Sequence, residues 1–195
     1  MSKIRVCFFV MIFVCLFTLV YSTNVLRVSY KAFLEKFDKI ELPYHTRSIE
    51  QAKELKSGVN GLSFWGKQLA PQDSIYYTPP PEFEKGYWTI DAMAAGRYKY
   101  GDIDVLLFFL TGDCENGASL RPMLELCTYK NKKIVSRIIV EGGQYEEYGY
   151  YKFYESIIDN GTVRVIEEVG EQGVSTRQEK LYQIDISGRL ITKSL

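Results

Sequence analysis

Three acidic residues have the spacing and surroundings that acid–base catalysis requires. Asp102 and Asp104 alternate along one face of an expected strand, and Glu147 lies within a run of tyrosines. Two carboxylates that flank a glycosidic bond can protonate the leaving oxygen and activate water or attack the sugar. The sequence does not give the separation of these acids. A small hydrolase of the cell envelope, using such a carboxylate pair, is therefore the alternative hypothesis for the function.

Other catalytic and cofactor signatures are missing from the sequence. The single histidine, His45, follows Pro43 and is typical of an exposed turn. There is no nucleophile elbow, no phosphate-binding glycine loop and no Cys/His set at zinc-binding spacing. The acids near Asp113 lack the alternating spacing and the distal glutamate of a calcium loop. The sequence predicts no cofactor and no metal, and it favours a protein that is not an enzyme.

Aromatic residues give the better functional signal. They make up 14% of the chain, and fifteen of its residues are tyrosine. Exposed rings bind sugars, peptides or partner proteins through a large apolar contact that also carries a polar group. The structural alternative is that these rings fill the core and coat the sheet edge. The candidate binding residues are Trp65, Tyr76, Tyr77, Trp88, Tyr148, Tyr150 and Tyr151.

Residues 1–22 have the organisation of a secretory signal peptide. Lys3 and Arg5 form a basic start, an apolar run follows, and Ser22 ends a stretch suited to a signal peptidase. The apolar run is about fifteen residues, whereas a comfortable membrane span needs ~20. We expect cleavage before Thr23, no stable membrane span afterwards, and a periplasmic or outer-surface location. An uncleaved anchor is the alternative.

The charge of the chain argues against nucleic acid as a partner. The formal charge is zero, and loss of Lys3 and Arg5 with the signal leaves −2. Proteins that bind nucleic acid show a basic field instead. Bases predominate over residues 121–140 and acids over residues 141–171. We interpret these two runs as the solvated outer faces of neighbouring strands.

Export also decides how the cysteines are interpreted. The processed chain keeps Cys114 and Cys127, an even pair in an oxidising compartment. The expected pairing places Cys127 opposite Leu107 and Cys114 in the connecting loop, a separation of roughly 20 Å. A disulfide requires ~5.5 Å between Cα atoms. The bridge would form only if the loop folded back over the sheet, and two separate thiols are the alternative.

Three consecutive strands over residues 103–110, 123–129 and 134–140 organise the predicted fold. The first is apolar on both faces, so we expect it to be central and covered on each side. The other two alternate, which predicts one dry face. That face would carry Leu124, Leu126, Ile134, Ile138 and Val140, and the opposite face Glu125, Lys133 and Arg137. Further short strands are expected at residues 87–90 and 95–99.

Local signals define two helices and two hairpins around these strands. Apolar residues from Tyr30 to Phe37 recur at helical spacing, and Ser48 with Gln51 forms a capping box for a second helix that ends at Ser57-Gly58. Asn160-Gly161 favours a type I′ turn, and Ser187-Gly188 marks a closing hairpin. The first turn predicts the pairs Ile158 with Val163, Ser156 with Val165 and Tyr154 with Glu167.

Several of these segments also resemble small exported proteins of Bacteroides-type bacteria. The similarity rests on the export signal, the helix over residues 33–37, the Tyr98-Lys99-Tyr100-Gly101 entry to an apolar strand, and residues 124–129 before a Lys-rich turn. It covers most of the processed chain. The resemblance implies a periplasmic or outer-surface setting and supplies no catalytic residues.

Together these features predict an α+β protein dominated by an antiparallel β-sheet. We expect a meander of hairpins, sandwich- or barrel-like, with one or two short N-terminal helices packed on it. Residues 23–195 would form one domain, helical over 23–57 and mostly β over 58–195. The favoured function is an exported, non-enzymatic binding module of the cell envelope, with a glycan or an envelope protein as its partner.

Overall fold

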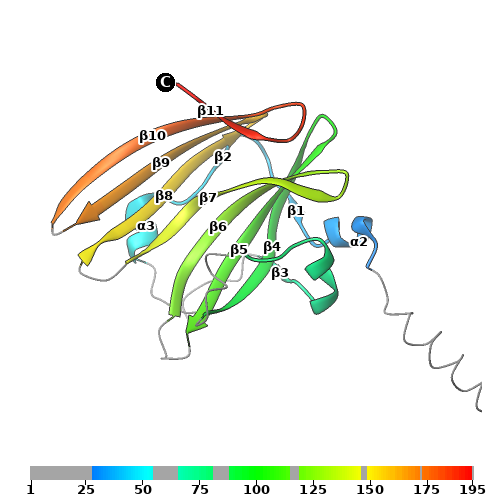
Figure 1. Cartoon of the computed structure of the whole chain (residues 1–195), viewed down its shortest axis with the longest axis horizontal. Helices are drawn as coiled ribbons and strands as arrows, with labels where there is room; N and C mark the ends of the chain where they lie inside the picture. Colours follow the sequence, from blue (N-terminus) through cyan, green and yellow to red (C-terminus); the bar gives the residue numbers. More distant parts are fainter. Residues whose placement is uncertain are drawn as a thin grey trace, which may run out of the picture.

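An antiparallel meander forms most of the chain (Figure 1). The computed structural model describes residues 28–54, 66–80, 88–114, 119–145, 149–171 and 173–194. Each strand from β4 onward pairs with the next one along the sequence, so the chain is mainly β, as predicted. These strands are β4 (Trp88–Tyr100), β5 (Ile103–Cys114), β6 (Ser119–Lys130), β7 (Lys133–Tyr145), β8 (Tyr151–Asp159), β9 (Thr162–Glu171), β10 (Val174–Ile184) and β11 (Leu190–Lys193).

Short elements from the N-terminal part add to this sheet, at its β4 edge and beside the interior strand β8. β1 pairs with β4 in parallel, β3 pairs with β4 antiparallel, and β2 pairs with β8. Two of these strands therefore lie within the part that was predicted to be helical. The elements are α2 (Tyr30–Leu34), β1 (Asp38–Lys39), β2 (Tyr44–His45), α3 (Ile49–Glu54), β3 (Lys67–Gln68) and the 3₁₀ helix η2 (Pro71–Ile75).

The central strand β5 is buried on both faces, in agreement with its unbroken apolar sequence. Residues of one parity join an inner core that also receives side chains from β8, β9 and β10. Residues of the other parity join an outer core covered by α2 and by Tyr77. The inner core consists of Met93, Ile103, Val105, Leu107, Phe109, Leu124, Leu126, Val140, Ile158, Val163, Val165 and Ile184. The outer core consists of Phe33, Phe37, Tyr77, Ala94, Leu106, Phe108, Leu110, Cys127 and Tyr129.

The prediction of one dry face is wrong for β6. Its other face is buried as well, because Tyr77 covers Glu125 and Cys127, which are 1% and 0% exposed. The predicted parity also fails at Ile134. A register shift between Thr128 and Tyr129 turns Ile134 toward the outer core, whereas Ile138 faces the inner one. A bulge adds one residue to one strand and so reverses the alternation beyond it.

The strands expected at residues 87–90 and 95–99 are one strand, β4. The alanines between them interrupted the β-rich pattern in the sequence. Pairing with β5 nonetheless continues along β4, with one register shift between Ala94 and Gly96. Backbone hydrogen bonds to a neighbouring strand thus outweighed the low strand propensity of alanine.

Two short helices, α2 and α3, are present, and each contributes buried residues, among them Phe33 of α2 and Ile49 of α3. At the start of α2 the Ser29 hydroxyl accepts a hydrogen bond from the Ala32 N–H at 3.1 Å. The helix ends at Leu34, earlier than predicted. Its Phe33 packs near Phe108 in the outer core. The capping box of α3 is formed, with Gln51 N to Ser48 Oγ at 3.3 Å and the reciprocal bond at 3.0 Å. The predicted end of this helix at Ser57-Gly58 lies outside the described residues.

Hairpin registers follow their turn residues. Around Asn160-Gly161 the pairs Ile158–Val163, Ser156–Val165 and Tyr154–Glu167 all form as predicted. Asn131 and Lys132 have φ of 52° and 66°, which gives the tight turn between β6 and β7. The last hairpin is wider than its Ser-Gly dipeptide suggested, because Ile184 pairs with Leu190 across a five-residue connection.

The sheet folds where β7 and β8 separate. These two strands pair only from Gly142 to Tyr145, and Thr46 lies between them beyond that point. The Thr46 N–H donates to Ser156 O at 3.0 Å, while its hydroxyl contacts Val140 O at 3.4 Å. The start of β11 also contacts β7, where the Leu190 N–H donates to Ser136 Oγ at 3.2 Å. The second half of the meander therefore folds toward the first half, with the inner core between them.

Candidate ligand-binding site

A cavity of about 280 Å³ lies on the inner face of the sheet. Ala95 and Gly96 of β4, Leu107 and Phe109 of β5, and Leu124 of β6 form one side. Ala95 and Gly96 are consecutive, yet both line this side, because the register of β4 on β5 shifts between Ala94 and Gly96 and interrupts the strand alternation. The cavity thus has a floor of backbone and hydrocarbon.

The segment from Asp38 to Arg47 forms the opposite side of this cavity. It crosses from β1 at the edge of β4 to β2 beside β8, and it appears as the light-blue chain between the two halves of the sheet in Figure 1. Ile40 and Tyr44 pack against the inner core and line the cavity. Gly96 permits this crossing, because a Cβ there would lie 2.6 Å from Cγ2 of Ile40.

A buried ion pair closes the polar end of the cavity. The Arg47 guanidinium contacts the Glu141 carboxylate, and the backbone N–H of Arg47 donates to Glu141 Oε2 at 3.2 Å. Side-chain exposure is 16% for Arg47 and 3% for Glu141. Because the charges neutralise each other, this end of the cavity offers hydrogen-bonding groups without a net charge.

Tyr44 adds a neutral hydroxyl beside this pair. Burial raises the pKa of the Tyr44 phenol, and the negative charge of Glu141 raises it further. The group therefore stays protonated at physiological pH and can donate or accept one hydrogen bond.

Two of the predicted binding residues, Tyr76 and Tyr77, belong to the core instead of a binding surface. The Tyr77 ring stacks on Phe108 with centroids 3.9 Å apart, and its hydroxyl donates to Glu125 at 2.8 Å. Tyr76 donates to Val28 O at 2.9 Å and contacts Phe33. Their sequence neighbourhood is irregular, but the 3₁₀ helix before them turns both rings onto the sheet.

Tyr150 and Tyr151 are partly exposed and lie on opposite faces of the second half of the sheet. Tyr150 lines a shallow groove of about 520 Å³ together with Val169, Val174 and Thr176. Tyr151 instead packs beside α3 and donates to Glu168 at 2.9 Å. Trp88 is the first residue of β4, while Trp65 and Tyr148 lie outside the described residues.

The carboxylates proposed for hydrolysis have separate partners. Asp102 is exposed and forms an ion pair with Lys130 at 3.1 Å. Asp104 accepts a hydrogen bond from the Tyr30 hydroxyl at 3.1 Å. Glu147 lies outside the described residues. The two acids that line the cavity on the inner face are Asp38 and Glu141.

Cys127 is a free, fully buried thiol, so the disulfide to Cys114 is not formed. Cys127 pairs with Leu106, one residue from the predicted partner, and Cys114 ends β5 instead of lying in the following loop. The strand extends further than predicted, which places the two cysteines far apart along the sheet. His45 is exposed, as expected, but it lies in β2 instead of a turn.

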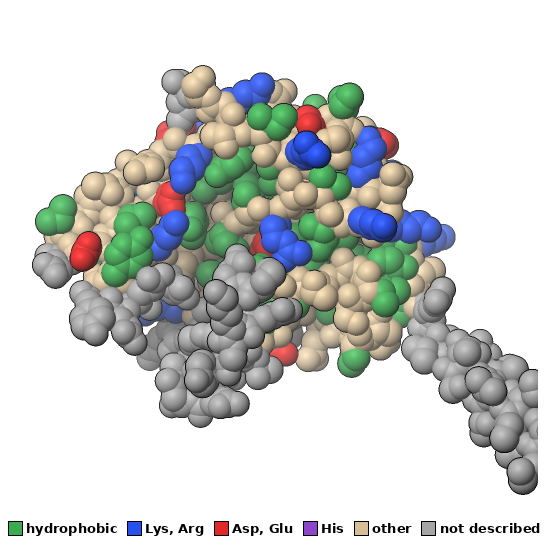
Figure 2. Space-filling view, in the orientation of Figure 1, with side chains coloured by type: hydrophobic (Ala, Val, Ile, Leu, Met, Phe, Trp, Pro, Cys, Tyr) green, Lys and Arg blue, Asp and Glu red, His purple; other side chains and the backbone are tan. Residues whose placement is uncertain are grey.

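The face shown in Figure 2 carries more basic than acidic side chains, and apolar side chains show between them. Charge on this face does not single out one binding area. Among the described residues there is no group of three metal-ligating side chains, and no helix there is long and apolar enough to cross a membrane.

Comparison of the chain with known protein families, curated proteins and solved structures finds no match. Arg47 and Glu141, the residues at the polar end of the cavity, were not identified from the sequence. Each is a single charged residue in an ordinary setting, and only the crossing segment brings them together.

Proposed function

We propose that this protein is an exported binding module that holds a compact, uncharged and largely apolar molecule in the cavity on its inner face. One observation carries the proposal. Apolar side chains line one side of the cavity, and the Arg47–Glu141 ion pair lies at its polar end. Ligand sites combine an apolar lining with a few convergent polar groups in this way.

The size and the electrostatics of the cavity limit the ligand. Its volume of about 280 Å³ lies just below the range of typical small-molecule sites, which run from ~300 to ~1,000 Å³. It suits a small molecule or one end of a longer chain. An anionic ligand would lose its hydration without gaining an unpaired cation, since Glu141 already neutralises Arg47 and the other charged residue of the lining, Asp38, is an acid. Tyr44 offers a hydrogen bond to one polar group of the ligand.

Binding is favoured over hydrolysis because the Glu141 carboxylate is already held in a buried ion pair. Its two oxygens accept from the side chain and from the backbone N–H of Arg47. A carboxylate held in this way would have to break a buried ion pair before it could act as a base or a nucleophile. Asp38, the other acid at the cavity, is exposed. An arrangement with two available carboxylates is what the hydrolase hypothesis requires.

The setting that we propose is the cell envelope, after cleavage before Thr23. Support comes from the basic and apolar organisation of residues 1–22. We further propose that the meander closes as a half-open sandwich. Its two layers would be β4–β7 and β8–β11, and contacts such as the one between Leu190 and Ser136 support this closure. The cavity would then lie between the layers near their open side.

The test uses a neutral, environment-sensitive aromatic probe, N-phenyl-1-naphthylamine, titrated into the protein as isolated from its producing cell. We expect saturable fluorescence enhancement that the Ala95→Leu variant weakens at least about tenfold, because the added side chain fills the cavity. Ala32→Leu, an exposed change on α2, is the matched control and should bind as the wild type does. Thermal unfolding of each variant shows that it is folded. Equal enhancement in Ala95→Leu, or none in the wild type, would refute the proposal.

A further inference from the structure

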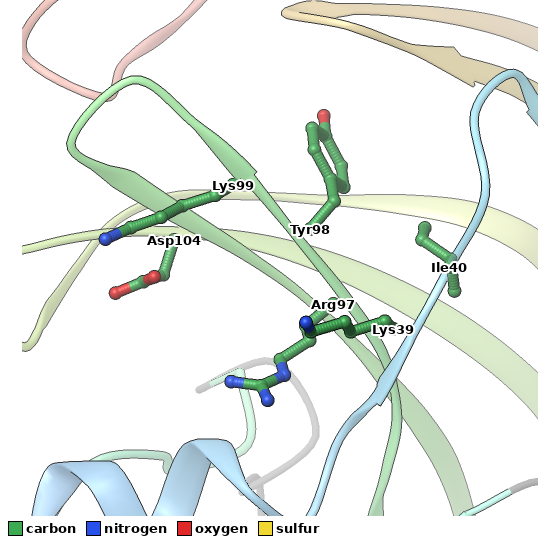
Figure 3. A pocket seen from close by; sticks show the side chains of 6 residues that line it. All are labelled: Lys39, Ile40, Arg97, Tyr98, Lys99 and Asp104. Carbon is green, nitrogen blue, oxygen red and sulfur yellow. The ribbon is translucent and has the colours of Figure 1, made fainter.

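Three basic side chains gather at the outer edge of β4, away from the cavity on the inner face. Arg97 and Lys99 are two residues apart in the strand and so point to the same face. Lys39 of β1 is the parallel partner of Arg97, which places its side chain next to that of Arg97. Figure 3 shows the three side chains on one side of the β4 ribbon, with the Tyr98 ring on the other.

These cations are not neutralised by ion pairs within the part of the chain that the structure describes. None of the three forms an ion pair there, although five of the described carboxylates are buried in pairs elsewhere. Asp104 lies opposite Lys99 in the register but accepts its hydrogen bond from Tyr30. Nε of Arg97 is buried and has no hydrogen-bond partner among these residues.

Such an arrangement lowers the stability of the protein when nothing is bound. Like charges on directly paired strand residues repel each other. A buried donor without an acceptor adds a further cost. An anion placed between the three side chains would relieve both penalties.

The edge of the sheet also leaves room for such an anion. β1 has two residues, and its pairing with β4 ends where the Ile40 N–H donates to Arg97 O at 3.0 Å. Beyond this point a notch of about 390 Å³ is lined by Lys39, Arg97, Lys99 and Asp104, with Ile40 and Tyr98 at its apolar margin. By strand alternation the Lys99 N–H points toward the same edge as Arg97 O, which gives the notch a backbone donor as well.

We propose that this notch binds a phosphoryl group, either as inorganic phosphate or as a small phosphate ester. Three cations and one carboxylate leave a local charge of +2, which matches a dianion better than a carboxylate. The guanidinium of Arg97 presents the planar fork that binds two oxygens of such a group, and Lys39 and Lys99 supply point charges on either side. The site is separate from the inner cavity, and its ligand does not depend on the function proposed above.

The test is isothermal titration of the isolated protein with inorganic phosphate and with glycerol phosphate, each at constant ionic strength. We expect saturable binding of one or both, weakened at least about tenfold by Arg97→Gln and about threefold by Lys39→Gln. Glutamine removes the charge and keeps a polar, unbranched side chain in the strand, and Lys39 is exposed, so its variant should fold normally. Lys67→Gln, an exposed change in β3 on the same edge of β4, is the control and should bind as the wild type does.

The outcomes separate the two ligand sources and the two sites. Tighter binding of glycerol phosphate assigns an ester as the ligand, and equal binding assigns the phosphate group alone. The Ala95→Leu variant should keep its phosphate affinity, since it alters only the inner cavity. Unchanged affinity in Arg97→Gln, or no saturable binding in the wild type, would overturn the proposal.

Discussion

Arg47 and Glu141 are 94 residues apart in the sequence, yet they form a buried ion pair that fixes the crossing segment to β7. The contact uses the backbone of Arg47 as well as its side chain. It therefore holds the chain itself in place, along with the edge of the inner cavity.

Arg47→Met should destabilise the protein by about 3–5 kcal/mol, because it leaves the Glu141 carboxylate buried without its counter-charge. The double variant Arg47→Met/Glu141→Leu should regain most of that loss, since a buried pair can be replaced by apolar side chains at little net cost. Urea denaturation measures the free energy of unfolding for each variant. A single variant that costs under about 1 kcal/mol would show that the pair has no role in fixing the segment.

Gly143→Ala should cost more than about 3 kcal/mol. Gly143 has φ of +142°, and a Cβ there would lie 2.0 Å from the carbonyl oxygen of Lys152 in β8. Gly101→Ala is the matched control, since Gly101 has φ of +60° but no atom within 4 Å of an added Cβ. It should cost about 1 kcal/mol from backbone strain alone. Similar unfolding midpoints for the two variants would mean that β7 and β8 do not meet as closely as the structure has them.

Stability should fall as the pH drops below about 4.5 because of Glu168. Burial raises the pKa of this carboxyl, but hydrogen bonds from Lys53, Arg177 and Tyr151 outweigh burial and lower the pKa from 4.5 to about 2. A carboxyl with a depressed pKa in the folded state contributes stability above its unfolded value. That contribution is lost as the pH falls toward 2.

Thermal melting between pH 5 and pH 2 measures this effect. The Glu168→Gln variant should be less stable than the wild type at pH 5, and its melting temperature should decline less steeply on acidification. Glu54→Gln, an exposed change on the neighbouring α3, should follow the wild type. Parallel curves for wild type and Glu168→Gln would contradict the assignment.

The Cys127 thiol should be unreactive in the folded protein. It is fully buried, and burial together with the Glu125 carboxylate raises its pKa well above the usual value. The thiolate is the reactive species, so both its exclusion from solvent and its raised pKa slow alkylation. In a Cys114→Ser background, labelling with iodoacetamide should be slow until denaturant is added, with Cys127→Ser as the control. Rapid labelling under native conditions would show that the outer core opens readily.

Short-range geometry explains what the sequence alone predicted correctly. The turn at Asn160-Gly161 sets the pairing of β8 and β9, and the Ser48–Gln51 box begins α3, because both depend on residues within a few positions of each other. The unbroken apolar run of β5 predicted its two covered faces for a similar reason. A strand with apolar side chains on both faces must have both faces covered, and this can be recognised from the side chains of the strand itself.

Parts of the sites also left a signal in the sequence. Arg97, Tyr98, Lys99 and Tyr100 alternate bases with aromatic rings, which is the pattern of a strand with a basic face. Lys39, the third cation of the notch, gives no such signal. Its position follows from the parallel pairing of β1 with β4, about sixty residues later in the chain.

The tertiary structure decided the rest. The turn of Ile134 toward the outer core depends on a bulge, and the burial of Tyr77 depends on Phe108 and Glu125 in strands that come later in the sequence. The insertion of Thr46 between β7 and β8 creates the fold in the sheet, and with it the inner cavity. A periodic pattern shows that a residue will be buried, but which distant segment covers it is settled only when the whole chain packs.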